Sequence, residues 1–431
     1  MLLSTEGTQA TERKNEREMK KFIALLIAVC LAFAVLTGCN QSAAGDTAAP
    51  AADEADVQPA EDATADTADA SEADAAAAAV ETKSVDFAAI YALHQPDEVV
   101  AAVDGRDVTW AEYFYWLYVQ GSQIDNYIQQ MAAYYGLQIS WDDTLEDGSD
   151  ETYADIALSN AESMLCQVYG IEGYAKANKV ELTDADKETV KTQLESDIKA
   201  VCGDDGTEEQ FNEKIAETYL PRELYDRICA VDALYNDGFN EKYGENGEKV
   251  TDEDAVKYLE DNGYLSANHI LLMTIDPDTR EALTDEQIAE KKATAEKIAA
   301  ELKAIKDPEE LVKRFAELKA EYCEDTGKET YPDGYVFTEG KMVAEFEDTV
   351  KALSEHEVSD PVESQYGFHV IMRLPSDADR TVSYSSDGKA LSARYLAASD
   401  AYQTDVSAYI DTLSCDFASG FEKPVITDYL K

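Results

Sequence analysis

The amino-acid sequence predicts an α+β fold, in which a long helical region precedes a smaller segment of strands and helices. Apolar residues recur at helical spacing through residues 95–262, and helix N-cap motifs divide this stretch into several helices. Residues 264–375 instead predict a strand, two helices, a loop, a short helix and two strands. The chain has 431 residues, of which 45% are hydrophobic, so it is long enough for more than one packed core.

The N-terminal region has the pattern of a secretion signal followed by a lipid-attachment motif. Lys20-Lys21 precede an unbroken apolar run over residues 22–36, which is too short and wrongly flanked for a comfortable membrane-spanning helix. The run ends in Leu36-Thr37-Gly38-Cys39, which resembles a bacterial lipobox. That resemblance implies cleavage before Cys39 and lipid on its thiol and amine. The alternative is a plain secretory signal with an incidental cysteine.

Residues 40–83 form an acidic segment that predicts a disordered linker. Up to Thr82 the segment is rich in Ala, Asp, Glu and Thr, contains no basic residue, and includes eleven acidic ones. Such a segment has almost nothing to bury and repels itself, so we expect a flexible tether of roughly 40 Å or more. Its expected role is to hold the folded part away from a lipid surface. The alternative is that its acidic residues bind cations of the cell wall.

Composition and residue spacing exclude several classes of function. The formal charge of −53 argues against a nucleic acid as the main partner, because a phosphate backbone needs a basic face. The four histidines and seven cysteines show no CxxC or HExxH spacing, so we expect neither a metal site nor a cofactor. Five cysteines besides the two in the signal region lie far apart, and sequence alone cannot pair them in an oxidising compartment: Cys166, Cys202, Cys229, Cys323 and Cys415.

The region before residue 264 begins with a predicted β-hairpin and continues as helices. Val99–Val103 and residues 106–108 flank the turn Asp104-Gly105. Thr109 and Glu112 then form a capping box at the start of a long helix. The helices are rich in tyrosine, tryptophan and methionine, which could line a groove for unfolded polypeptide. The alternative is that these side chains simply form the core.

Three motifs follow one another in the segment 264–375. The first is Asn268-His269-Ile270-Leu271-Leu272, the second runs from Phe337 to Glu347, and the third runs from Val358 to Ile371. Together they resemble the parvulin-type (PpiC) peptidyl-prolyl isomerases. With the lipobox and the helical region, the chain resembles the PrsA-type foldase lipoproteins and is similar in layout to SurA. The resemblance implies a small four-stranded mixed sheet surrounded by helices, inserted into a mostly helical, chaperone-like domain.

The resemblance also implies roles for individual residues. The paired parvulin histidines fall on His269 and His369, on neighbouring central strands, and Ser364 matches a hydroxyl residue that hydrogen-bonds into that pair. Asp325 matches the position that faces the substrate amide. The histidines could also be structural, without a direct effect on rate. The expected substrate-binding residues are Met342, Phe346, Tyr335 and Phe337, with Met342 and Phe346 four residues apart on one helical face.

One position departs from the parvulin pattern. Many parvulins have Gly-Gly-Asp-Leu-Gly before the phenylalanine that matches Phe337, whereas this chain has Tyr331-Pro332-Asp333-Gly334-Tyr335-Val336. In an ungapped match Gly334 replaces the apolar leucine of the proline pocket. Either Tyr335 compensates for the missing side chain or the pocket is incomplete.

Prolyl isomerisation is compatible with these residues on physical grounds. The reaction breaks no bond, and its barrier of about 18–20 kcal/mol is the loss of amide resonance. A catalyst therefore needs an apolar slot that grips the proline ring and binds the twisted amide better than either planar form. Cys323 lies two residues from Asp325, but nothing in the sequence marks it as an activated nucleophile.

The resemblance predicts an extracytoplasmic isomerase and foldase, anchored by lipid on Cys39 to the outer face of the cell membrane, that assists secreted polypeptides. One alternative is a holdase chaperone whose parvulin domain is weakly active or inactive. A second is a lipoprotein module that binds a solute or a wall component. The sequence also leaves open whether the chain forms a homodimer.

The predicted domain organisation has five parts. The signal occupies residues 1–39, with 1–18 an expected gene-model extension ahead of Met19, and the linker occupies 40–83. The other three parts are a helical domain at 84–262, a parvulin domain at 264–375, and a C-terminal helix within 376–431 that completes the helical domain. Within that last part, the expected helix covers residues 389–413.

Overall fold

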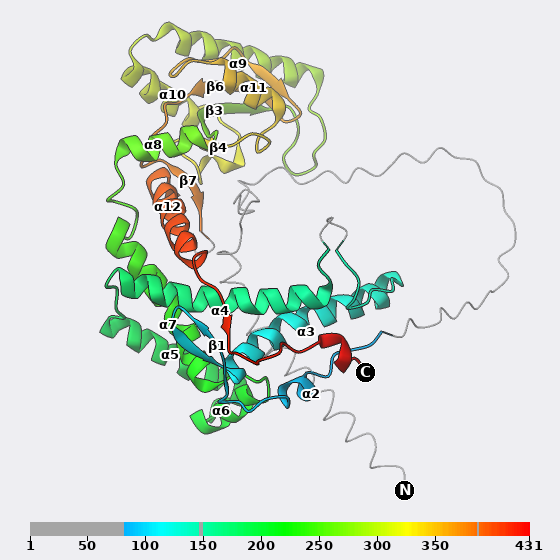
Figure 1. Ribbon diagram of the computed structural model, residues 1–431. Coiled ribbons are helices and arrows are strands. Elements are labelled where there is room, and N and C mark those ends of the chain that lie inside the picture. Colours follow the sequence, from blue (N-terminus) through cyan, green and yellow to red (C-terminus); the bar gives the residue numbers. More distant parts are fainter. Residues whose placement is uncertain (1–81, 146–149, 386–387) are drawn as a thin grey trace, which may run out of the picture. The chain divides into compact units, whose positions relative to one another are not determined.

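The computed structural model describes residues 82–145, 150–385 and 388–431 (Figure 1). The predicted signal, Cys39 and all of the predicted linker before Thr82 lie outside the described residues. Within the described part, no helix combines the length and apolarity that crossing a membrane requires. The described residues form two compact units: the first runs to Glu241 and resumes with Tyr402–Lys431, and the second is Lys242–Ala401.

The first unit contains a small sheet that includes the C-terminal segment. Strands β1 (Val99–Val103) and β2 (Arg106–Thr109) form the predicted hairpin, with Asp104 and Gly105 at φ 53° and 67°. Positive φ at both turn residues is the geometry that two-residue hairpins favour. Strand β9 (Asp416–Phe417) pairs with the other edge of β1, so the sheet order is β2-β1-β9.

Three helices of the first unit begin at the predicted caps Thr109, Thr183 and Thr207, whereas the cap Thr152 was not predicted. Thr109, Thr152, Thr183 and Thr207 each form a capping box, which satisfies backbone N–H groups that the first helical turn leaves unpaired. The short helix α2 was not predicted from the sequence. The helices are α2 (Phe87–Tyr91), α3 (Trp110–Tyr135), α4 (Tyr153–Ala177), α5 (Asp184–Cys202), α6 (Glu208–Ala216) and α7 (Arg222–Tyr243).

The aromatic residues of α3 divide between the core and the surface. Trp110, Tyr113 and Phe114 are fully buried, so for them the core alternative holds. Tyr134 and Tyr135, at the other end of the helix, are exposed. Trp110, Tyr113 and Phe114 therefore do not line the expected groove for unfolded polypeptide.

The second unit is built on a four-stranded sheet with the order β4-β3-β6-β5. Every recorded strand pair in it is antiparallel, so the expectation of a mixed sheet was wrong. Strands β5 and β6 are joined by the two residues Gln365 and Tyr366, a connection that only antiparallel neighbours allow, whereas long segments with helices separate β3 from β4 and β6. The strands are β3 (Leu265–Met273), β4 (Tyr335–Phe337), β5 (Val362–Ser364) and β6 (Gly367–Arg373).

Helices pack on both faces of this sheet. Helices α9 (Asp285–Ala304) and α10 (Pro308–Tyr322) bury Ile298 and Phe315 against Ile270 and Val370. Helix α11 (Ala344–Ala352) buries Phe346 and Val350 against Ala267 and Ile371. The α+β fold class predicted from the sequence is confirmed.

The unit also holds elements on either side of the expected parvulin segment. Helix α8 (Asp252–Asp261) precedes it, and a hairpin of β7 (Thr381–Tyr384) and β8 (Ala390–Ser392) follows it. The expected helix over 389–413 is shorter, because α12 (Ala393–Ile410) begins only after β8. The run Thr381-Val382-Ser383-Tyr384 alternates polar and apolar side chains, a strand pattern that the helical expectation overlooked. Leu259, Val336 and Ala393 share one cluster, which ties these elements to β4.

The compact units change at residues 241/242 and 401/402, whereas the predicted domain boundaries lie after residues 262 and 375. The difference arises because α8, the hairpin and the start of α12 pack with the sheet-bearing unit. The cluster of Leu259, Val336 and Ala393 determines this boundary, and such a three-dimensional contact cannot be recognised from amino-acid composition. The division into a helical and a parvulin domain stays a prediction.

Candidate active site

Two buried histidines meet on one face of the sheet. His269 lies on β3 and His369 on β6, and they are diagonal neighbours because His269 pairs with Ile371 and Leu271 pairs with His369. Their Nδ1 atoms are 3.1 Å apart, and the rings stack with centroids 5.3 Å apart. Only 6% of His269 and 4% of His369 is exposed. The predicted pair on neighbouring central strands is thus present.

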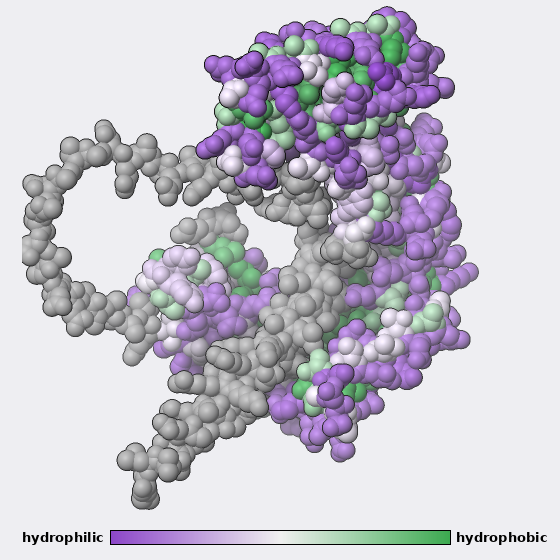
Figure 2. Space-filling model, turned by 180° about the vertical axis from the view of Figure 1, so that it is seen from behind, coloured by the Kyte–Doolittle hydropathy of each residue, from purple (hydrophilic) through white to green (hydrophobic). Residues whose placement is uncertain are grey.

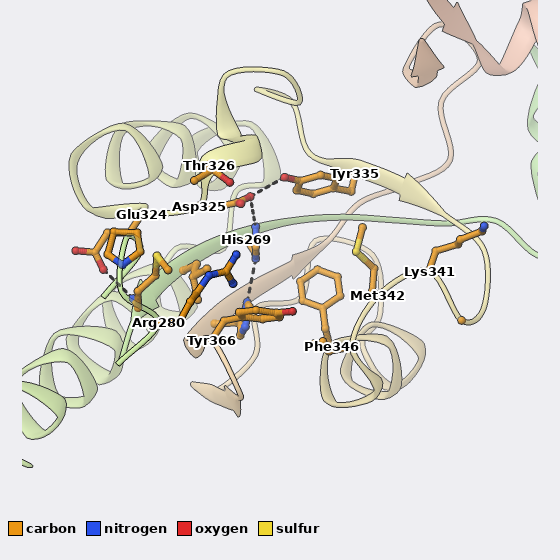
Figure 3. A pocket seen from close by; sticks show the side chains of 16 residues that line it. His269, Arg280, Glu324, Asp325, Thr326, Tyr335, Lys341, Met342, Phe346 and Tyr366 are labelled. Atoms are coloured by element: carbon orange, nitrogen blue, oxygen red, sulfur yellow. Dashed lines mark hydrogen bonds and ion pairs between the residues drawn. The ribbon is translucent and has the colours of Figure 1, made fainter. Parts of the chain in front are cut away.

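The histidines belong to a longer chain of hydrogen bonds (Figure 3). Nε2 of His269 is 2.9 Å from Oδ2 of Asp325, and the hydroxyl of Tyr335 donates to the same oxygen at 2.6 Å. At the other end, Nε2 of His369 is 2.7 Å from Oγ of Ser364. The structure therefore brings together five residues that were predicted at the site: the four expected catalytic residues, and Tyr335, which was expected to bind substrate.

Donor and acceptor roles in this chain follow from the charge of Asp325. An ionised carboxylate only accepts, so His269 donates through Nε2. In the neutral form of His269, its Nδ1 then accepts from Nδ1 of His369. Nε2 of His369 then accepts from the Ser364 hydroxyl, whose oxygen accepts the backbone N–H of Tyr366 at 3.1 Å. With both rings neutral, every polar atom along the chain has a partner.

Three side chains of the site, His369, Asp325 and Tyr335, have clearly shifted pKa values. Burial, and next to it the proximity of His269, lowers the pKa of His369 to about 3. Burial alone would raise the pKa of Asp325, but hydrogen bonds from His269 and Tyr335 hold it well below its usual range. Burial and the bond to Asp325 raise the pKa of Tyr335. Near pH 7 the site therefore contains a neutral His369, an ionised Asp325 and a protonated Tyr335.

The end of α10 positions Asp325. The amide of Glu324 donates to the carbonyl of Leu271 at 2.9 Å, which joins this segment to β3. Asp325 then caps a short 3-10 helix, η1 (Thr326–Lys328), by accepting the N–H of Gly327 on Oδ1 at 3.0 Å. Cys323 is buried, and burial raises its pKa, which favours an unreactive thiol.

The network lies against a cavity of about 520 Å³. Side chains of β3 at every second position, His269, Leu271 and Met273, line it together with Met342 and Phe346 (Figure 3). The ring of Phe346 meets His269 edge-on, with centroids 5.3 Å apart. The remaining lining residues are Pro277, Arg280, Glu324, Asp325, Thr326, Tyr335, Gly340, Lys341, Val343, Tyr366 and His369.

Met342 and Phe346 both line the cavity, but they do not share a helical face. Helix α11 begins at Ala344 with Val343 as its N-cap, so Met342 belongs to the preceding loop. Val343 offers no side-chain cap, and the buried carboxylate of Glu347 instead accepts the N–H groups of Met342 at 2.9 Å and Gly340 at 3.1 Å. The helix thus begins two residues later than the expected start at Met342, and these bonds fix the loop that carries Met342.

Gly334 is a glycine for steric reasons. Its φ is +101°, and a Cβ atom there would lie 2.6 Å from the carbonyl oxygen of Ala267. No leucine could occupy this backbone position unchanged, and the next side chain, Tyr335, reaches the cavity instead. Phe337 does not line the cavity and packs behind it, with its ring centroid 5.7 Å from that of Phe346.

The sequence analysis missed a buried lysine that holds the loop before β4. Lys319 on α10 is 5% exposed, and its Nζ donates to the carbonyl oxygens of Tyr331 and Pro332, each at 3.0 Å. Burial lowers its pKa. Its position four residues after Phe315 on the apolar side of α10 was the available signal, since an exposed lysine would not be expected there.

Comparisons with known proteins agree with the geometry of the second unit. Residues 269–374 match the family model of the PPIC-type PPIase domain. The foldase protein PrsA of Oceanobacillus iheyensis is 30% identical over 224 residues, which cover 52% of this chain and 62% of that protein. PrsA of Caldanaerobacter subterraneus is 29% identical over 282 residues, covering 64% of this chain and 72% of that protein. The chain thus spans less than two thirds of the first of these relatives.

Two solved structures are also similar. The crystal structure of PrsA from Bacillus subtilis matches at 20% identity, over 74% of this chain and 90% of that one, with a TM-score of 0.21. The solution structure of NmPin, the parvulin of Nitrosopumilus maritimus, matches at 27% identity over 26% of this chain and 96% of that one, with a TM-score of 0.19. The parvulin-type domain predicted from the three motifs is confirmed over residues 269–374.

Proposed function

We propose that this chain, which carries a PPIC-type PPIase domain and is similar to the PrsA foldases, catalyses cis–trans isomerisation of X-Pro bonds in unfolded polypeptides. The observation that carries the proposal is the cavity of about 520 Å³ whose apolar lining meets the Asp325–His269–His369 network. Such a cavity can hold a proline ring against a rigid polar wall.

The proposed mechanism uses binding energy and no covalent step. Met342, Phe346 and Leu271 hold the proline ring in an apolar setting, where the charge separation of a planar amide is disfavoured. The barrier of about 18–20 kcal/mol falls to the extent that the site binds the twisted amide more tightly than either planar form. Both oxygens of Asp325 already accept hydrogen bonds, so its carboxylate is held in one orientation beside the bound amide.

The histidines act in this proposal as positioning residues. His369, Ser364 and the Tyr366 amide fix the tautomer of His269, which in turn orients Asp325. Tyr335 completes the wall and stands where the ungapped parvulin pattern has a glycine. The proposed substrate contacts are therefore Met342, Phe346, Tyr335 and Asp325, with Phe337 supporting Phe346 from behind.

For the whole chain we propose a lipid-anchored, extracytoplasmic foldase for secreted polypeptides. The signal pattern, the lipobox ending in Cys39 and the acidic linker support this location. Mass spectrometry of membrane-extracted protein tests it: lipid on Cys39 supports the anchor, and an unmodified chain released after cleavage contradicts it. A homodimer stays a prediction that the solution mass of the chain tests.

The test of the isomerase proposal is the isomerisation rate of X-Pro peptides with the chain from Asn40 onward. Asp325→Ala and Met342→Ala should each lower kcat/KM at least tenfold, which corresponds to about 1.4 kcal/mol of transition-state binding. Met131→Ala, which truncates a half-buried methionine of α3, serves as the control and should retain the rate. No catalysis by the parent chain contradicts the proposal. Suppression of aggregation would then favour the holdase, and its absence would favour a solute-binding module.

A further inference from the structure

The C-terminal segment of the first unit follows one face of helix α4. Lys423 forms an ion pair with Glu162, the thiol of Cys415 donates a hydrogen bond to Cys166, and Ile410 lies against Gly170. Glu162, Cys166 and Gly170 are four residues apart, so they share one helical face. The two cysteines therefore meet in the middle of a continuous contact.

Both sides of this contact are anchored. A Cβ atom on Gly170 would lie 2.5 Å from Ile410 and 3.3 Å from Leu413, so the end of α12 approaches the backbone of α4 closely. Immediately after Cys415, strand β9 pairs with β1 through Ala102–Asp416 and Ala101–Phe417. The position of Cys415 is thus fixed from both directions along the chain.

The remaining cysteines have other surroundings. The Sγ of Cys323 accepts the N–H of Leu271 at 3.4 Å within the second unit. Cys229 interacts with Tyr225, and burial raises its pKa to about 11. Cys166 and Cys415 are half-buried, as are Cys202 and Cys229, but they differ from these in interacting with each other.

We propose that Cys166 and Cys415 form a disulfide bond that fastens the C-terminal segment to helix α4. Two sulfur atoms in hydrogen-bond contact need side-chain rotation to reach a bond length of about 2 Å, and the anchored backbones already hold the two residues beside each other. The bond encloses residues 167–414, including the whole second unit, in one covalent loop.

The oxidant is a disulfide compound of the extracytoplasmic space, either a small molecule or a protein. The thiolate of Cys166 attacks one sulfur of that compound and releases a thiol. The thiolate of Cys415 then attacks the mixed disulfide on Cys166 and releases the second thiol. Two protein thiols lose two protons and two electrons, and the compound is reduced to two thiols. The hydrogen bond from Cys415 lowers the pKa of Cys166, which suits it to the first attack.

The bond is expected to stabilise the first unit mainly through the unfolded chain. Closing a long loop removes much of the freedom of the unfolded state, so the oxidised chain should unfold at a higher temperature than the reduced one. The C-terminal segment should also lose its ability to detach from α4 on its own.

The experiment exposes the chain from Asn40 onward to oxidised glutathione, alkylates the remaining thiols under denaturing conditions, and maps the peptides by mass spectrometry. We expect a peptide pair joined through Cys166 and Cys415, with Cys202, Cys229 and Cys323 alkylated. Cys415→Ser should abolish the pair and leave glutathione on Cys166, whereas the control Cys202→Ser should retain the pair.

The proposal is independent of isomerase activity, and its outcomes are separate from those of the peptide assay. Alkylation of both Cys166 and Cys415 after oxidation overturns it. So does a bond from either residue to Cys202 or Cys229, or a bond between two copies of the chain. A pair that forms but leaves the unfolding temperature of the oxidised chain equal to that of the reduced chain overturns the fastening role.

Discussion

Gly334 illustrates what a single residue means in sequence and in structure. In the sequence, Gly334 stands where the ungapped parvulin pattern has a leucine, so the pattern predicts a proline pocket that lacks one apolar side chain. In the structure its φ of +101° and the nearby carbonyl of Ala267 leave no room for a side chain, and Tyr335 contributes to the cavity instead. A motif comparison cannot reveal this exchange, because the backbone dihedral angle is not written in the pattern.

The depressed pKa of His369 predicts a dependence of stability on pH. In the unfolded chain the imidazole titrates near 6.5, whereas in the fold its pKa is about 3. Between these values the unfolded state binds more protons, so the free energy of unfolding falls as the pH falls from about 6.5 towards 3. At pH 5 the loss attributable to His369 is about 2 kcal/mol, since one pKa unit corresponds to about 1.4 kcal/mol.

Native-state hydrogen exchange of the β3 and β6 amides measures this loss once intrinsic exchange rates are corrected. In His369→Gln the stability difference between pH 7 and pH 5 should shrink by that amount. His94→Gln, in the other unit, should leave the pH dependence of β3 and β6 unchanged. An equal pH dependence in the parent chain and in His369→Gln would show that the imidazole does not titrate as the structure implies.

At the scale of elements, the sequence predicted helix starts best where a threonine side chain caps the helix. The capping boxes of Thr109, Thr183 and Thr207 were predicted correctly, because each depends on two residues three apart, whereas that of Thr152 was missed. The start of α11 was misjudged, since its N-terminus is tied by Glu347 from inside the helix and not by a cap. The hairpin β7–β8 was missed because its strands are short and half-buried.

The role of Glu347 gives a prediction about α11 and its loop. Glu347→Gln replaces one acceptor oxygen by an NH2 group, so the bonds to the N–H groups of Gly340 and Met342 cannot both persist. Met342 then loses its fixed position, and we expect kcat/KM for X-Pro peptides to fall about tenfold with the lining residues intact. Glu345→Gln, on the same helix but exposed, is the matched control and should retain the rate. Equal rates in both variants would remove Glu347 from the positioning of the loop.

At the scale of the whole chain, some properties could be predicted from the sequence and others could not. The PPIC-type domain followed from three ordered motifs and the fold class from apolar periodicity, whereas the signal and the linker stay predictions. Boundaries between compact units did not, because they depend on which side chains of α8 and α12 cluster with β4. The formal charge can be counted directly from the sequence, which has 89 acidic and 36 basic side chains.

That charge predicts a response to salt. Figure 2 shows hydrophilic residues over most of the visible face of the described residues, and an excess of negative charge at such a surface repels itself in the compact state. Raising NaCl from 0.01 M to 1 M shortens the screening length from about 30 Å to about 3 Å. We therefore expect the thermal unfolding midpoint to rise by several degrees over this range.

Surface ion pairs would produce the opposite response, because salt weakens them. Arg394, which bridges Asp252 and Asp379, is one such group in the second unit. A chain shortened to begin at Thr82 separates the linker from the folded units and should show the same rise, since screening within the folded surface is the cause. Choline chloride in place of NaCl separates screening from binding of the cation. A midpoint that falls with either salt would mean that paired charges such as those of Arg394 outweigh the net repulsion.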